Sequence, residues 1–355
     1  MTIELQFEQK NIKSIIIYNR KVEAVLNQAA RDLSQRIGAY ELKYPTATIS
    51  QGSFYLRNKG LKSKIDTILN KLHKDIEGNI KAGIVSNWNL SNLKNDELTG
   101  KWASGIGLDK NQIPTSFNQL NLAALDTFLT RTAAGMTISE RVWNLVNGAK
   151  DQVELYLASG ISTGKSAGGI ARDIKQYLNE PDRLFRRVRQ DGKLVLSKAA
   201  RGYKPGSGIY RSSFQNAKRL ARNEINMSYR MSDYTRRKQL PFITGIMVHL
   251  SASHPILDMC NDLQGKYPKG FIFGGWHVNC ICYTTSIMLS EKNSLNFMKT
   301  GKIAKANYIN KIPKRATNWV KANAKTIAGY KNTPFFIADN FDKNFNLMER
   351  VTEVK

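Results

Sequence analysis

The scarcest side chains of this 355-residue chain are concentrated in one short stretch. All three cysteines and three of the four histidines fall between residues 249 and 282. Thiolate and imidazole together are ligands that select zinc among the common metals, and four of them close a tetrahedral structural site. We therefore predict a structural zinc ion in this stretch, with ligands drawn from His254, Cys260, His277, Cys280 and Cys282.

The spacing leaves the fourth ligand open. His277 and Cys280 have a bite close to that of a Cys-x-x-Cys pair, and Cys260 could reach them across the intervening loop. The fourth ligand could be Cys282, His254 or Asp258. Cys-x-Cys is a tighter chelate than Cys-x-x-Cys, so Cys282 and His254 are nearly equal candidates. The alternative is a metal-free β module with buried thiols and a hydrogen-bonded histidine.

No catalytic constellation is found in the sequence. A zinc deaminase needs His-x-Glu with Pro-Cys-x-x-Cys, and a zincin needs His-Glu-x-x-His; both patterns are absent. The glycine-rich stretch 160–169 lacks the spacing of a phosphate loop, so we predict a turn in which Ser166 caps a helix. Glu224 lies within an apolar helical face, where a carboxylate needs a buried partner, such as Arg222 or an upstream arginine, or a catalytic or metal-supporting role. We interpret it as structural and predict that the chain is not an enzyme.

The charge balance indicates a polyanionic partner. Lys and Arg number 54 against 28 Asp and Glu, which gives a net charge of +26. Nucleic acid is the usual partner of such a surplus, and a passive basic surface is the alternative. Residues 182–213 combine a hairpin, predicted around Asp191-Gly192, with a dense set of cations and interleaved aromatics. The predicted contacts to double-stranded DNA are Arg183, Arg186, Arg187, Arg189, Lys193, Lys198, Arg201, Lys204 and Arg211.

Most of the chain has helical periodicity. Apolar residues at spacings of three and four predict helices over 21–38, 65–76, 142–157 and 214–238, whereas 86–118 is rich in Asn, Ser, Gly and Lys and predicts a loop. The fold class is mainly α, with an N-terminal helical bundle, a basic hairpin and a small α+β C-terminal module that carries the Cys/His zinc site. The predicted regions are 1–135, 136–240 with the insertion 182–213, the metal module 241–290, and a basic tail 291–355.

The sequence also bears on the compartment. The N-terminus lacks the pattern of a signal peptide, and no stretch approaches the roughly 20 apolar residues of a membrane helix. Three cysteines make a poor disulfide framework. We expect a protein that is made in a reducing cytoplasm and does not associate with membranes. In the tail, residues 333–341 form a short apolar segment. It packs on its own domain, or it docks on the metal module or on a partner.

The order of these residues resembles the phage head-morphogenesis family, the minor head proteins typified by the F protein of phage Mu. The resemblance covers roughly residues 139–285. It rests on the segment Arg222 to Asn226, on His254-Pro255 followed by Asp258-x-Cys260, and on His277-x-x-Cys280-x-Cys282. The usual family ending is His-Pro-x-Cys-Arg-Cys, and this chain has Val278 and Ile281 at the Pro and Arg positions.

The resemblance implies a minor structural protein of a tailed-phage head. Such a protein would be synthesised in the bacterial host cytoplasm and packaged inside the head near the portal, with the portal protein, other head proteins and packaged DNA as its partners. It would act in head morphogenesis and, in some relatives, in DNA ejection. The portal is also the expected partner of the apolar segment 333–341 if that segment docks outside its own chain. Two alternatives are an enzyme that uses Glu224 near the metal, acting on nucleic acid or protein, and a metal-containing, nonspecific DNA-binding protein of a mobile element.

We expect the purified protein to bind double-stranded DNA without sequence preference. If about five cations of residues 183–222 neutralise phosphates, counterion release should weaken binding about 500-fold between 50 and 200 mM salt. Replacing Arg183, Arg186, Arg187 and Arg189 with Gln should flatten the salt dependence equally on unrelated sequences, which a binding titration at several salt concentrations measures. Salt-independent binding, or none, would exclude DNA as the partner of these cations.

Overall fold

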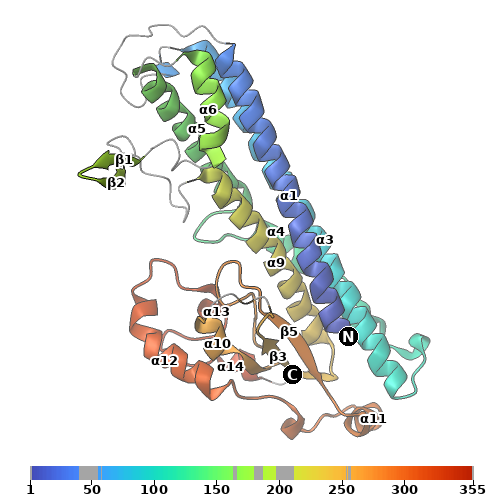
Figure 1. Ribbon diagram of the computed structural model, residues 1–355. Coiled ribbons are helices and arrows are strands. Elements are labelled where there is room, and N and C mark those ends of the chain that lie inside the picture. Colours follow the sequence, from blue (N-terminus) through green and yellow to red (C-terminus); the bar gives the residue numbers. More distant parts are fainter. Residues whose placement is uncertain are drawn as a thin grey trace. The chain divides into compact units, whose positions relative to one another are not determined.

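A computed structural model confirms the mainly helical fold class (Figure 1). It describes residues 2–39, 55–56, 58–162, 166–179, 187–196, 212–252, 254 and 257–353. An N-terminal helical bundle is joined in the chain to a small C-terminal module with a three-stranded antiparallel sheet, and this module carries the three cysteines.

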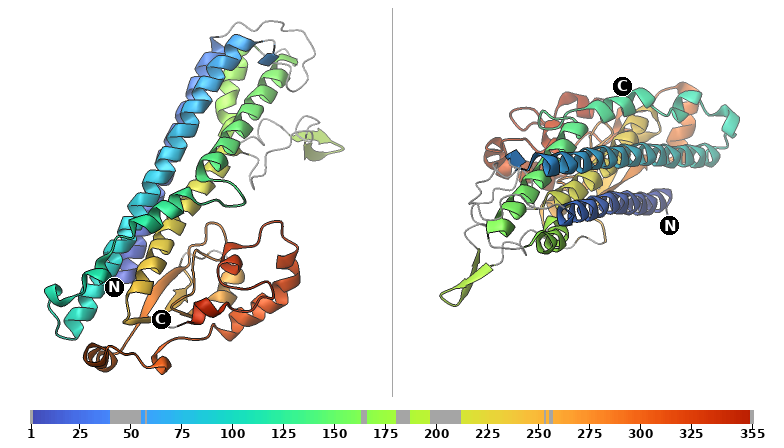
Figure 2. Two further views of the ribbon diagram at one scale, coloured as in Figure 1. Left: turned by 180° about the vertical axis from the view of Figure 1, so that it is seen from behind. Right: turned by 90° about the horizontal axis from the view of Figure 1, so that it is seen from above.

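The chain forms two compact units, and each is assembled from separate stretches of sequence. Unit 1 comprises residues 1–15, 83–129 and 223–355, and unit 2 comprises 16–82 and 130–222. Three helices contribute a segment to both units: α1 (Ile3–Gly38), α3 (Lys59–Gly105) and α9 (Ser213–Gln239). In each unit a segment of α1 runs beside a segment of α3 (Figure 2). The contiguous regions expected from composition therefore differ from the compact units, whose boundaries fall inside α1, α3 and α9.

Unit 2 is a helical bundle that also contains α5 (Ile138–Ser162) and α6 (Ala167–Asn179). Its core holds the periodic residues predicted from the sequence, among them Leu33 of α1, Leu69 of α3 and Val153 of α5. The Ser166 hydroxyl accepts a hydrogen bond from the Gly169 amide at 3.1 Å, so this serine caps α6 as predicted.

The predicted hairpin is also present in unit 2. Strand β1 (Arg187–Gln190) pairs antiparallel with β2 (Lys193–Leu196). The turn residues Asp191 and Gly192 have φ of 51° and 76°, which is the left-handed pair that a two-residue hairpin turn requires.

The prediction of a loop over residues 86–118 is wrong for most of its length. The segment 86–105 is the C-terminal part of α3, and non-helical chain begins only after Gly105. Trp88 and Trp102 supply its apolar contacts, while Ser91, Asn95 and Thr99 are fully buried as well. These polar residues line a polar helix interface within unit 1, so a composition typical of loops marks a buried surface instead.

The opposite side of that interface is α9, whose buried face is charged. Asp233 accepts hydrogen bonds from Lys94 at 2.5 Å and from Asn95 at 3.1 Å, and it forms an ion pair with Arg237 at 3.2 Å. The guanidinium of Arg236 is fully buried and pairs with Asp96. Burial would raise the pKa of Asp233, but Lys94 and Arg237 hold that pKa below its ordinary value.

The C-terminal module of unit 1 is built around a sheet with strand order β4-β3-β5. Strand β3 (Ile243–His249) is central and pairs antiparallel with β4 (Gly265–Pro268) and with β5 (Tyr283–Met288). The other elements of unit 1 are η1 (Lys110–Gln112), η2 (Thr115–Asn118), α4 (Leu122–Thr130), α10 (Met259–Leu263), α11 (Glu291–Thr300), η3 (Lys305–Asn307), α12 (Lys314–Ala328), α13 (Phe335–Ala338) and α14 (Glu349–Thr352).

The tail packs on the module that precedes it. One apolar cluster contains Trp276 and all three cysteines together with Val320 of α12 and Phe336 of α13. Phe336 meets the Trp276 ring edge-on at a centroid distance of 5.4 Å. The apolar segment 333–341 is thus packed within unit 1 against the cysteine-bearing module and not left free for a partner.

Replacing Asp233 with alanine should lower the free energy of unfolding by about 3–5 kcal/mol, because Lys94 and Arg237 would remain buried without a negative partner. Glu97→Ala, on an exposed position of α3 in the same unit, is the matched control and should change stability by less than about 0.5 kcal/mol. Denaturant unfolding of both variants measures the difference, and equal effects would contradict the interpretation.

We also expect Asp233 to make the stability of the folded protein decrease in acid. Since the folded-state pKa of Asp233 is lowered, its contribution is present above the unfolded pKa of about 3.9 and is lost as the pH falls below it.

Candidate metal centre

Cys260 is held by a short capped helix. Asp258 precedes α10 and accepts a hydrogen bond from the Cys260 amide at 2.7 Å. In return, the Asp258 amide donates to Asn261 Oδ1 at 3.1 Å, which completes a capping box. This reciprocal pair fixes the first turn of α10 and with it the position of the Cys260 side chain, which is 1% exposed.

Cys280 and Cys282 lie in the loop before β5. The Cys280 amide donates a hydrogen bond to the His277 carbonyl at 3.1 Å and closes a turn. Within this turn Asn279 has a left-handed φ of 63°. The sulfur atoms of Cys260, Cys280 and Cys282 all lie within 4.8 Å of one another, and all three residues are buried.

Two histidines lie close to Asp258, and one of them also lies close to a thiol. His277 Nε2 lies 3.2 Å from Cys260 Sγ and 3.3 Å from Asp258 Oδ2, and His254 Nε2 lies 3.2 Å from Asp258 Oδ1. The ligand atoms of His254, Asp258 and Cys260 also lie within 4.8 Å of one another. Cys260 is thus shared by two groups of candidate ligands, the three thiols and the set His254, Asp258 and Cys260, while His277 approaches Cys260 and Asp258.

The tautomer of His277 suits a metal ligand. Its Nδ1 lies 3.0 Å from the Val278 carbonyl, which can only accept, so Nδ1 carries the proton in the neutral ring. The lone pair is then on Nε2, the atom that faces Cys260.

The three thiols hydrogen-bond to one another, so the pKa of each depends on the other two. Hydrogen bonds from the Cys260 and Cys282 thiols lower the pKa of Cys280 well below its ordinary value. Hydrogen bonding to Cys280 and Cys282, together with burial, raises the pKa of Cys260. Three buried thiolates cannot coexist without a compensating cation. The cysteines are free thiols rather than a disulfide, and this donor set fits a divalent metal ion that would let all three ionise.

Arg230 of α9 holds the cysteine loop from within the core. Its guanidinium is buried and donates to the carbonyl oxygens of Gly274 at 2.9 Å, Cys280 at 2.8 Å and Cys282 at 2.6 Å. Gly275 has a φ of 114°, and a Cβ there would collide with this guanidinium and lie 3.1 Å from the Cys280 Cβ. The loop thus has a backbone conformation that only glycine adopts readily, next to a charge that fixes it.

A series of amide hydrogen bonds links the same loop to α1 and α3. Asn226 of α9 donates to the Cys280 carbonyl at 3.1 Å and accepts from Asn11 at 3.2 Å. Asn11 accepts from Asn87 at 2.8 Å, and Asn87 accepts from Ser14 at 2.5 Å. Each amide has both its donor and its acceptor groups engaged, so the side-chain orientations are mutually dependent.

The sequence analysis did not single out Arg230 or Asn11, and it named Asn226 only as the end of a segment that carries the resemblance. The only available signal was a polar residue on an otherwise apolar helical face, the signal by which Glu224 was noticed. Glu224 is indeed buried, at 1% exposure, whereas Arg222 is exposed.

The predicted DNA-binding residues are only partly covered by the structure. Arg187 and Arg189 lie on β1, and Lys193 is exposed at the start of β2. The other six lie outside the described residues: Arg183, Arg186, Lys198, Arg201, Lys204 and Arg211.

Comparisons with family models, curated proteins and solved structures found no match to this chain. Among the described residues, no helix is both long enough and apolar enough to cross a membrane.

Protein purified in reducing buffer without added metal should contain about one equivalent of a transition metal, measured by elemental analysis. Cys280→Ser should lose most of this metal and unfold more easily, because metal binding and folding are coupled. Ser294→Ala, which alters a buried hydroxyl outside the apolar cluster that contains the thiols, is the control and should keep the metal. A metal content near zero in the unaltered protein would contradict the prediction of a metal site.

Proposed function

We propose that this chain is a minor structural protein of a tailed-bacteriophage head, located inside the head near the portal vertex. One observation carries the proposal: the buried thiols of Cys260, Cys280 and Cys282, with His277 beside them, occur in the residue order that resembles the head-morphogenesis family. The site borders a packed apolar core, and the proposed role is structural rather than catalytic.

We further propose that the metal is zinc, held by Cys260, Cys280, Cys282 and His277. A tetrahedral site with Zn–S of about 2.3 Å and Zn–N of about 2.0 Å places neighbouring sulfur and nitrogen ligands about 3.5 Å apart. The 3.2 Å between His277 Nε2 and Cys260 Sγ is close to that value. The ion supplies a cross-link between α10 and the loop before β5. His254 remains the alternative fourth ligand through its contact with Asp258.

The charge of the chain supports a location beside DNA. Lys94, Arg230, Arg236 and Arg237 are buried and compensated within unit 1, so they do not contribute to the surface potential. The surplus of +26 is much larger than these four charges, and most of it is available to a polyanion. Packaged double-stranded DNA is the proposed nonspecific partner, and the portal and other head proteins are the proposed protein partners.

Mass spectrometry of purified phage particles tests the proposal. We expect this chain in full-length particles at low copy number relative to the major capsid protein, and its loss from particles that lack the portal. Tail-only fractions are the control and should not contain it. Absence from intact particles would rule out a head protein and favour the DNA-binding protein of a mobile element.

A further inference from the structure

The exposed side of α12 carries a row of cations. This helix lies within residues 292–338, where ten Lys and Arg occur without a single Asp or Glu, and all ten cations are exposed. All 15 residues of α12 are described, and the helix forms an outer edge of the C-terminal module (Figures 1 and 2). The positive charge of this segment is therefore on the surface of unit 1.

Three of these cations share one face of the helix. Lys314, Lys321 and Lys325 are spaced by seven and four residues, which places them in a row because an α-helix has 3.6 residues per turn. The buried residues Val320 and Ile327 lie on the opposite face and pack into the apolar cluster of the module. At a rise of about 1.5 Å per residue, the row is about 16 Å long.

The charge of this row is not compensated within the described part of the chain. None of the described carboxylates forms an ion pair with Lys314, Lys321 or Lys325. Lys314 also lies in the first turn of α12, where the positive end of the helix dipole disfavours a cation. The charge of these lysines therefore does not stabilise the helix that carries them, and it is available to a partner.

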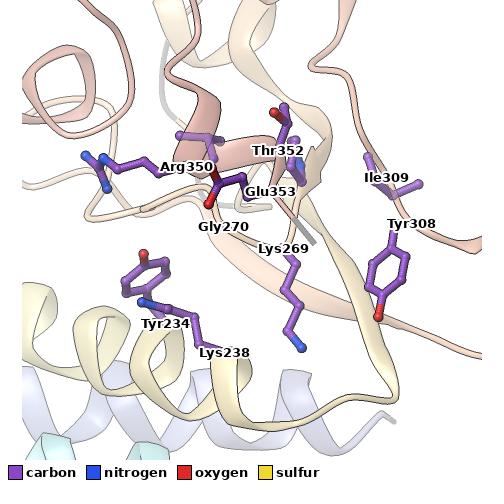
Figure 3. A pocket seen from close by; sticks show the side chains of 11 residues that line it. Tyr234, Lys238, Lys269, Gly270, Tyr308, Ile309, Arg350, Thr352 and Glu353 are labelled. Atoms are coloured by element: carbon purple, nitrogen blue, oxygen red, sulfur yellow. The ribbon is translucent and has the colours of Figure 1, made fainter. Parts of the chain in front are cut away.

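The cations around the cavity between α9 and α14 differ from this row (Figure 3). Lys269 donates to the Leu240 carbonyl at 2.7 Å, and Arg350 donates to the Asp339 carbonyl at 2.5 Å. The two side chains point apart. They hold backbone segments of their own unit, so they do not form a common surface for a polyanion.

The chemistry of the α12 face distinguishes among possible polyanions. None of the residues of α12, all of which are described, is an exposed large hydrophobic one. A helix that lies in a membrane interface needs an exposed apolar face, and protein interfaces are depleted of lysine and enriched in aromatic residues. A DNA backbone requires neither, because cations meet phosphates that repeat about every 3.4 Å along each strand. The row therefore fits DNA best.

We propose that α12 contacts the backbone of double-stranded DNA through Lys314, Lys321 and Lys325. This inference rests on the proposed function, which makes packaged DNA the partner, and it adds the surface that meets the duplex. A row of about 16 Å spans about five nucleotides of one strand. Contacts to phosphates carry no base information, so this binding has no sequence preference.

A binding titration of the full-length protein with a short DNA duplex at several salt concentrations tests the surface. Replacing Lys314, Lys321 and Lys325 together with Gln should make the slope of log K against log salt less steep by about 2.7, because three phosphate contacts are lost. Lys321→Gln alone should change this slope by about 0.9. All three positions are exposed, so thermal unfolding of both variants should match that of the unaltered protein.

The matched control replaces Lys59, Lys64 and Lys74 with Gln. These exposed lysines of α3 belong to unit 2 and are not aligned in one row along the helix. Their replacement removes the same total charge from the chain. We expect the slope to stay unchanged, since a loss of net charge alone removes no phosphate contact.

The outcomes separate this inference from the proposed function. If the unaltered protein binds DNA and the α12 variant has the same slope as the control, the α12 surface is wrong while DNA remains the partner. If the unaltered protein shows no salt-dependent DNA binding, the proposed DNA partner fails, and the α12 inference fails with it. If poly-glutamate displaces the protein as well as duplex DNA does at equal charge concentration, the surface serves acidic proteins, which contradicts the inference.

Discussion

The buried charges of α9 are the constraint on which unit 1 depends. Arg230, Asp233 and Arg237 occupy successive turns of one helical face, and none of them contacts bulk water to any extent. Burying such groups is unfavourable unless every donor and acceptor is satisfied. The neighbouring elements meet that requirement: α3 supplies Lys94 and Asn95, and the C-terminal module supplies backbone carbonyls. The charged face therefore sets the register in which these elements can pack.

The candidate metal centre adjoins this face. The same helix that buries Asp233 holds the cysteine loop through Arg230 and Asn226, so the carbonyls of Cys280 are fixed before any ion is considered. The three thiols come from two separate segments, α10 and the loop before β5. All three can be ionised at the same time only if a cation lies beside them. The guanidinium binds the backbone and the proposed zinc would bind the side chains, and these two interactions act on the same short loop from opposite directions.

Sequence patterns predicted the apolar part of this protein well. Helical spacing identified the core of unit 2, as with Leu33 and Val153, because side chains that repeat every three to four residues must share a helical face. The Asp191-Gly192 turn and the Ser166 cap were predictable because each depends on local backbone chemistry. The patterns failed over residues 86–105, where Asn95 and Thr99 are buried against charges that lie about 140 residues further along the chain. A polar composition is typical of a loop unless such a distant partner is known.

The sequence by itself determined which residues could bind a metal, since cysteine and histidine are scarce and occur together. It could not determine how they are arranged, and it left Cys282, His254 and Asp258 as alternatives for the fourth ligand. Only the tertiary structure decided that Cys280 and Cys282 point to one place, because the loop lies outside β5 and is held by Arg230. It also decided which cations face solvent and which are internal. Charge and ligand type are properties of single residues, whereas burial and coordination depend on segments that meet only in the folded chain.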